Sequence, residues 1–171
     1  MSMGGNVTYM NKVIDSLSIR PARINDIIRL NKLFIQSIDT DFTYFSDSFK
    51  KKLASQHNIP RLAKAYLSPF AQLILAWDGH ELVGYCLLRS EPKSLSYLHW
   101  MYVRPDQRGR KLGESLLQAA IETAESHHAH ALQLVTHDKE EFYARYHFTP
   151  LRRIPGLIGG ADMTVMELKL G

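Results

Sequence analysis

The sequence lacks several features that would set it apart from ordinary globular domains. It has a single cysteine, Cys86, among 171 residues, so it has no internal disulfide, which fits a reducing compartment. No run of about 18 apolar residues is present, and we expect no membrane-spanning segment. The first residues also lack the apolar core of a signal peptide. These absences predict a cytoplasmic protein that does not associate with membranes. Cys86 stands in an apolar run, which favours a buried, unreactive thiol.

Two common phosphate-binding patterns are also missing. The sequence contains neither Gly-x-x-x-x-Gly-Lys-Ser/Thr nor Gly-x-Gly-x-x-Gly, which argues against a P-loop nucleotide triphosphatase and against a Rossmann dehydrogenase. The net charge is +4, but the basic residues are scattered and aromatic residues do not alternate with them. We therefore expect no nucleic-acid partner. No Cys/His spacing is typical of zinc, and we expect no metal site.

The remaining sequence alternates between helical and strand-like periods and predicts one domain. Residues 1–16 are polar and mixed, and we expect a flexible lead-in before a domain that spans residues 17–171. No repeat or long linker divides this domain. The alternation predicts an α/β (α+β) fold with a central mixed, mostly antiparallel sheet and helices on both faces.

The expected elements follow from apolar spacing and from turn residues. Asn25 or Asp26 can cap the first helix. Its apolar stripe is predicted to consist of Ile27, Ile28, Leu30, Leu33, Phe34 and Ile38. Predicted helices cover residues 26–38, 46–67 with a break near 58–60, 113–126 and 139–146. Predicted strands cover residues 17–20, 72–77, 82–89, 95–103, 131–136, 149–153 and 163–168, with turns at 78–79, 155–156 and 159–160.

The segment Val103–Gly113 is the strongest candidate for a ligand site. It joins a predicted strand to a predicted helix, and the first amides of a helix have no partner within the helix. The helix dipole adds partial positive charge at the same place. Gly109 and Gly113 allow the backbone to come close to a ligand, and Arg108, Arg110 and Lys111 add formal charge. A pyrophosphate would fit this turn, although spacing alone also allows an ordinary basic turn.

The same segment resembles a known family motif. Residues Leu98–Leu117 resemble the central acetyl-CoA motif of the GCN5-related N-acetyltransferase (GNAT) family, in which an apolar strand end is followed by Arg/Gln-x-x-Gly-x-Gly/Ala. Arg108 matches the first position of this motif and Gly113 the last. Lys111 stands where the middle glycine is usual, which is a mild departure.

Three further segments resemble the same family in the expected order. Residues Ser18–Asp26 are similar to its opening strand and the start of its first helix, and Leu82–Leu88 to its central hairpin strand. Residues Glu141–Phe148 are similar to its late Phe-Tyr-x-x-x-Gly-Phe segment, with His147 in place of the glycine. The resemblance covers about residues 17–168, and it implies an N-acetyltransferase that uses acetyl-CoA as a co-substrate.

The resemblance also implies roles for particular residues. The backbone at the end of the strand would pair with the pantetheine arm, and the amides of the turn would hold the pyrophosphate. The implied cofactor-binding residues are Met101, Tyr102, Val103, Arg108, Gly109, Arg110, Lys111, Leu112 and Gly113.

Two residues are predicted to be catalytic. Tyr143 stands where the family often has a tyrosine that protonates the CoA sulfur, and its alternative is an aromatic residue packed under the cofactor. His99 is the first candidate for the general base, since an ordinary imidazole titrates near pH 6.5; its alternative is a structural histidine. Strand alternation places His99 on the face opposite Trp100. His137 and Asp138 form a second candidate pair.

The acceptor is the least determined part of this prediction. We expect a small-molecule or peptide amine, bound by residues 27–67 and by the loop at residues 154–162. Six residues in the first of these segments combine acidic and aromatic groups that would suit a cationic or aromatic amine: Asp39, Asp41, Phe42, Tyr44, Phe45 and Asp47. The alternative is a surface loop with a few packed rings. The alternative function is a non-catalytic acyl-CoA-binding or regulatory module of the same fold. A homodimer formed through the last strand also stays open.

Overall fold

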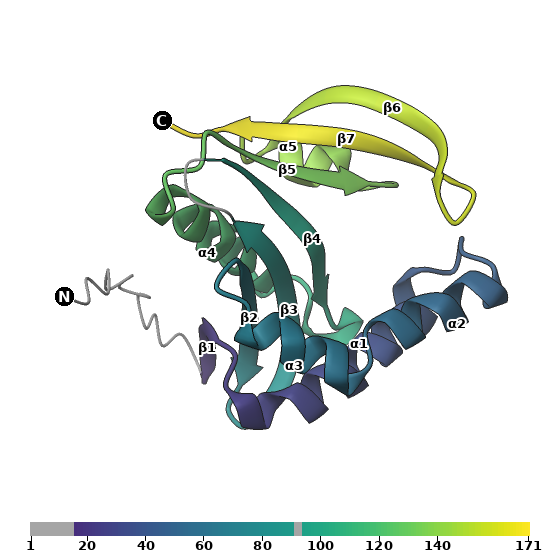
Figure 1. Ribbon diagram of the computed structural model, residues 1–171, viewed down its shortest axis with the longest axis vertical. Helices are drawn as coiled ribbons and strands as arrows, with labels where there is room; N and C mark the ends of the chain where they lie inside the picture. Colours follow the sequence, from purple (N-terminus) through teal and green to yellow (C-terminus); the bar gives the residue numbers. More distant parts are fainter. Residues whose placement is uncertain (1–15, 91–93) are drawn as a thin grey trace.

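The computed structural model describes residues 16–90 and 94–171, and these residues form one continuous sheet with helices on both faces (Figure 1). The predicted lead-in at residues 1–16 lies outside the described residues, except for its last residue. The helices that the structure describes include none long and apolar enough to cross a membrane.

The sheet has seven strands in the order β1-β2-β3-β4-β5-β7-β6. β4 and β5 are parallel neighbours, and every other pair of neighbours is antiparallel. The mixed, mostly antiparallel sheet expected from the sequence is therefore confirmed. The strands are β1 (Leu17–Pro21), β2 (Ala71–Asp78), β3 (Glu81–Ser90), β4 (Leu95–Val103), β5 (Ala131–Thr136), β6 (Thr149–Ile158) and β7 (Ala161–Lys169).

The helices cover the sheet from both sides and create two cores. Helices α1 and α3 pack on one face of β2 and β3, around buried residues such as Phe34 and Tyr85. Helix α4 packs on the other face, where Leu116 and Leu117 are fully buried. The helices are α1 (Ile27–Asp41), α2 (Asp47–Gln56), α3 (Ile59–Leu67), α4 (Leu112–Ser126) and α5 (Glu140–Ala144), with short 3-10 turns at Ile24–Asp26 and Pro105–Gln107.

Most of the predicted elements are present, and three details differ. Asp26 does not cap α1 with its side chain; its carboxylate instead accepts hydrogen bonds from Arg20 (2.7 Å) and from the amide of Arg23 (2.8 Å). Ile28, predicted on the apolar stripe of α1, is 57% exposed. The predicted turn at Pro155–Gly156 lies inside β6, because an irregularity in the pairing with β7 absorbs these residues without ending the strand.

Cys86 is fully buried in β3, as its apolar neighbours predicted. Burial raises the pKa of its thiol to about 12. The thiolate is the reactive form of cysteine, so this side chain acts as a small apolar core residue.

The turn between β6 and β7 packs against the chain that follows α1. It thereby links two parts of the molecule, one that holds β5–β7 and α5 and one that holds β1–β4 and α1–α4. Figure 1 shows this hairpin reaching toward the chain between α1 and α2. At the turn, a Cβ atom on Gly159 would lie 2.6 Å from the ring of Phe49 and 2.9 Å from that of Phe45. Only a residue without a side chain permits this approach. The contact closes one side of the space between these two parts of the molecule.

Gly84 provides a test of the packing between β3, β4 and α4. A Cβ atom at this position would lie 2.9 Å from the carbonyl oxygen of Tyr102, and 3.3 Å from side-chain atoms of Val103 and Leu116. The backbone oxygen cannot move aside cheaply, so Gly84→Ala should lower the free energy of unfolding by about 1–3 kcal/mol, measured by urea denaturation. Gly113→Ala is the comparison, because its backbone lies outside the left-handed region and its Cβ would make an ordinary contact, 3.6 Å from the ring of Phe142. Unchanged stability of Gly84→Ala would contradict this packing.

Candidate active site

The two parallel strands at the centre of the sheet separate partway along their length. β4 and β5 pair from Leu95–Leu98 and from Ala131–Leu134, and the pairing ends there. Beyond this point β4 continues to Val103 and β5 ends at Thr136. Figure 1 shows the strands diverging toward the β6–β7 turn. The edge of β4 that faces β5 is therefore open after Leu98, and an extended ligand has access to its backbone.

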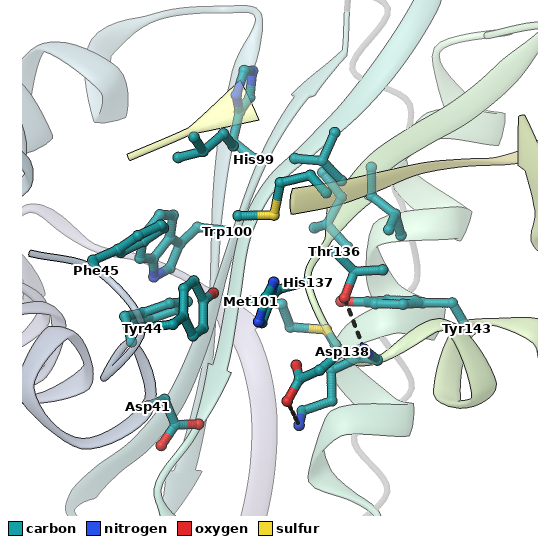
Figure 2. A pocket seen from close by; sticks show the side chains of 17 residues that line it. Asp41, Tyr44, Phe45, His99, Trp100, Met101, Thr136, His137, Asp138 and Tyr143 are labelled. Carbon is teal, nitrogen blue, oxygen red and sulfur yellow. Dashed lines mark hydrogen bonds and ion pairs between the residues drawn. The ribbon is translucent and has the colours of Figure 1, made fainter. Parts of the chain in front are cut away.

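A cavity of about 160 Å³ opens at this separation. Its walls come from β4, from the end of β5 and the turn that follows it, from α5, from the chain after α1, and from the β6–β7 hairpin (Figure 2). The lining residues are Asp41, Phe42, Tyr44, Phe45, Leu98, His99, Trp100, Met101, Leu134, Val135, Thr136, His137, Asp138, Lys139, Tyr143, Ile158 and Met163.

The turn between β4 and α4 leads from this cavity to the start of a helix. Gly109 has a φ of 81°, and a Cβ atom added to it would meet nothing within 4 Å. Lys111 occupies the N-cap position of α4, and its side chain makes no capping hydrogen bond to any described residue. Gly113 lies against the ring of Phe142, which neighbours Tyr143. Open space at Gly109 therefore comes just before the start of α4, and the N-terminus of a helix is a place where phosphate groups bind.

The arginines of this turn are held by carboxylates. Arg108 forms an ion pair with Asp41 and donates from Nε to the carbonyl of Val103 at 3.0 Å. Arg110 pairs with Asp78 at 2.6 Å. These contacts fix the arginines at the edges of the turn and offset part of their charge, so backbone amides and the exposed Lys111 remain to receive an anion.

Lys111 and His147 share an uncommon backbone conformation. Their φ angles are 62° and 66°, in the left-handed region that glycine adopts without steric cost. Both positions are those where the resembled family motifs have glycine. The backbone of this chain therefore keeps the glycine-type conformation at each position, although a larger residue occupies it.

Tyr143 lies on α5 and reaches the cavity from the side of β5. It is 9% exposed and packs at right angles to the rings of Phe142 and Phe148. Burial raises the pKa of its hydroxyl well above the usual value, and a smaller contribution comes from Cys86. The hydroxyl therefore keeps its proton throughout the neutral range, and it can donate a hydrogen bond or a proton.

His99 is the extra residue of a β-bulge in β4. Leu87 of β3 pairs with Trp100 whereas the adjacent Leu88 pairs with Leu98, so His99 has no partner in the register. The alternation that placed His99 opposite Trp100 does not hold through such a bulge, because the bulge redirects the side chain. The His99 side chain is exposed at the rim of the cavity. Partial desolvation lowers its pKa, as do the positive charge of Arg89 and, when it is protonated, His57. The imidazole is thus neutral at pH 7 and can accept a proton.

His137 occupies the cavity with a fixed orientation. Its Nδ1 lies 2.8 Å from the carbonyl oxygen of Asp162, and because a carbonyl only accepts, Nδ1 carries the proton. Nε2 of the neutral ring is then an acceptor. The ring stacks on Tyr44 with 4.2 Å between centroids, and Figure 2 shows it near the centre of the cavity. Burial and the charges of Asp138 and Asp41 raise the pKa of Tyr44 to about 12.

The structure brings most of the predicted site residues to one cavity or to the adjoining turn. Met101, His99 and Tyr143 line the cavity, and so do four of the predicted acceptor residues, Asp41, Phe42, Tyr44 and Phe45. The other two, Asp39 and Asp47, are exposed and lie outside the lining. Tyr102 does not line the cavity; its side chain is buried in the core beneath α1, where its hydroxyl lies 3.0 Å from that of Thr40, so only its backbone is available to a ligand. Leu112 is buried likewise.

Sequence reasoning assigned no role to Trp100, Thr136 or Met163, which also line the cavity. Trp100 directly follows His99, and this adjacency was the available signal. Met163 reaches the cavity because β7 folds back beside β5, which no local pattern in the sequence indicates.

Solved structures with the same fold are acetyltransferases. A GCN5-related N-acetyltransferase from Rhodopseudomonas palustris matches 92% of this chain and 98% of its own, with 24% identity and a TM-score of 0.74. The PaiA N-acetyltransferase of Thermoplasma acidophilum, solved with coenzyme A, matches 91% and 99%, with 19% identity and a TM-score of 0.75. YncA, a putative acetyltransferase from Salmonella typhimurium solved with acetyl-CoA, matches 91% and 95%, with 18% identity and a TM-score of 0.65. These likenesses define the fold class.

The family follows from the sequence itself. The model of the acetyltransferase (GNAT) family matches residues 34–148, which include β4, the turn, α4 and α5. The chain therefore belongs to the acetyltransferase (GNAT) family. No curated protein matched in the corresponding sequence comparison.

The left-handed residue at the start of α4 gives a stability test. Lys111→Gly should raise the free energy of unfolding by about 1 kcal/mol relative to Lys111→Ala, because only glycine removes the contact between Cβ and the carbonyl oxygen in this conformation. The same comparison at His147 should give the same sign. Chemical denaturation of the four variants measures both differences. Equal stability of the glycine and alanine variants would show that neither backbone carries this strain.

Proposed function

We propose that the chain transfers an acetyl group from acetyl-CoA to an amine. The observation that carries the proposal is the placement of the cavity. It opens where the edge of β4 becomes accessible after Leu98. The helix N-terminus at Lys111 follows in the chain, after the end of β4 and the turn. An acyl thioester on a long pantetheine arm with a pyrophosphate at its far end matches that sequence of features.

The cofactor fits the residues present. The amides from Arg108 to Gly113 would hold the pyrophosphate, helped by the dipole of α4. Gly109 offers open space for close approach. The backbone of Met101 and Val103, on the open edge of β4, would pair with the amide groups of the pantetheine arm as a short additional strand. This placement delivers the thioester to the cavity near Met101.

The reaction needs a proton acceptor and a proton donor on opposite sides of the thioester. The amine nitrogen attacks the carbonyl carbon, the new C–N bond forms, and the C–S bond breaks. The nitrogen loses one proton to a base, and the departing sulfur gains one from an acid. The buried, protonated hydroxyl of Tyr143 suits the acid. His99, whose pKa is lowered, suits the base.

His137 is a second candidate for the base. Its Nε2 is an acceptor in the neutral ring, held in place by the hydrogen bond from Nδ1 to Asp162 and by stacking on Tyr44. This fixed orientation favours proton transfer, since the ring need not reorient first. The two histidines lie on different strands, so substitutions separate their contributions.

Ligand binding tests the cofactor assignment. Acetyl-CoA and CoA should each raise the melting temperature, because a ligand that binds the native state alone stabilises it by mass action. ATP should have no comparable effect, since it lacks the pantetheine arm that pairs with β4. Differential scanning fluorimetry at equal ligand concentrations measures this. No shift with either CoA species at millimolar concentration would reject the pyrophosphate site, and binding without acetyl transfer to any amine would favour a non-catalytic acyl-CoA-binding module.

The pH dependence of kcat tests the catalytic residues. With His99 as base, kcat should rise with pH and its acid limb should lie below pH 6.5, because partial desolvation and neighbouring positive charges make His99 release its proton earlier than an ordinary histidine. His99→Gln should abolish that limb, and His137→Gln should leave it in place. Tyr143→Phe should lower kcat by about 100-fold or more without moving the limb.

Stopped assays of thiol release across pH 5–9, with amine and acetyl-CoA saturating, provide the measurement. If the limb disappears in His137→Gln and persists in His99→Gln, the base is His137. If Tyr143→Phe retains the full kcat, Tyr143 is a packing residue.

A further inference from the structure

The acceptor side of the cavity has an unusual composition of side chains. The rings of Phe42, Tyr44, Phe45 and Trp100 form a contiguous set, with centroid separations of 4.7 Å for Phe42–Trp100 and 4.5 Å for Tyr44–Phe45. Ile158 and Met163 complete this wall. An apolar or aromatic group in this space would replace water against aromatic surface on several sides.

The charges at the cavity favour a cation over an anion. Of the lining residues that the structure describes, Asp41 and Asp138 are acidic and Lys139 is the one permanent cation. Lys139 is already paired with Asp138 at 2.9 Å. Arg108, just outside the lining, is paired with Asp41. A carboxylate on the acceptor would therefore find no uncommitted cation among the lining residues. An ammonium would find Asp41 and Asp138 paired as well, but the ring faces attract a cation and repel an anion.

The size of the cavity limits the acceptor body. Its volume of about 160 Å³ is close to the roughly 150 Å³ of an apolar cavity that holds one benzene molecule. The thioester near Met101 would share this space, so the acceptor body can be no larger than about one ring. The Gly159 turn against Phe45 and Phe49 limits extension toward α2. A long flexible polyamine would leave the ring surfaces unfilled.

We propose that the acceptor is a primary amine joined by a short chain to a single aromatic ring and lacking a carboxylate. This inference rests on the proposed acetyl transfer. The ring would lie against Phe42, Tyr44 and Trp100, and the ammonium would lie near Asp41. It would release one proton to solvent before attack, and the attacking amine would lose the second to the catalytic base as the C–N bond forms.

A matched set of amines tests this assignment. The set comprises 2-phenylethylamine, phenylalanine, which adds a carboxylate to the same body, and spermidine, which replaces the ring by a polyamine chain. We expect kcat/KM for 2-phenylethylamine to exceed that for either other amine by at least 100-fold, measured by thiol release at saturating acetyl-CoA. Equal or faster acetylation of phenylalanine or spermidine would overturn the proposal.

A charge substitution tests the role of Asp41. Asp41→Asn should lower the preference for 2-phenylethylamine over phenylalanine at least tenfold, because it removes a carboxylate from the lining and frees Arg108. Asp39→Asn is the matched control: it makes the same change on the same helix at an exposed position outside the lining. An unchanged preference in Asp41→Asn, with a wild-type melting temperature, would remove Asp41 from the specificity site.

Binding distinguishes failure of this inference from failure of the proposed function. Calorimetric titration of 2-phenylethylamine into the protein saturated with CoA should show binding at one site. Binding without acetylation of any amine would support the site and reject catalysis. Absent binding, together with acetylation of another amine, would reject this acceptor class and leave acetyl transfer intact.

Discussion

The candidate site depends on the length over which two parallel strands stay paired. β4 and β5 share four residue pairs and then diverge, and because a strand that loses its neighbour exposes backbone donors and acceptors, the divergence creates both an opening and a surface with hydrogen-bonding capacity. The neighbouring antiparallel pairs keep the divergence in place: β3 holds β4 along nearly its whole length, and β7 holds β5. The cavity is thus a gap between two well-supported halves of one sheet.

The two histidines near this gap are positioned by different means. His99 stands at a bulge, where an extra residue in β4 changes the direction of the side chain. His137 follows the end of β5. It is oriented by the carbonyl of Asp162 on the neighbouring strand β7 and by the ring of Tyr44. The position of His99 therefore depends on the register of the sheet. The orientation of His137 depends on contacts with β7 and with the chain that follows α1.

The sequence was sufficient to predict the fold class, the limits of β4 and β5, and the turn before α4, since these follow from apolar periodicity and from glycine and proline positions. It also singled out acidic and aromatic residues between positions 39 and 47, and of these Asp41, Phe42, Tyr44 and Phe45 line the cavity. It could not show the divergence of the strands, because the lost pairing depends on three-dimensional twist. The bulge at His99 and the contribution of Met163 were hidden for the same reason, as each depends on which residue lies opposite in a neighbouring strand. Pro155–Gly156 misled the prediction because an irregular strand tolerates residues that otherwise mark turns.

The ion pair between Arg108 and Asp41 has a thermodynamic consequence. Arg108 belongs to the turn that would receive the cofactor phosphates, and Asp41 lines the cavity that would receive the amine. An anion that draws the Arg108 guanidinium away leaves the Asp41 carboxylate without its partner. A cation beside the Asp41 carboxylate weakens its attraction for the guanidinium in the same way. Occupancy of one end therefore alters affinity at the other by a coupling free energy that is the same in both directions. The two halves of a ternary complex would communicate through a single pair of side chains, without any movement of the backbone.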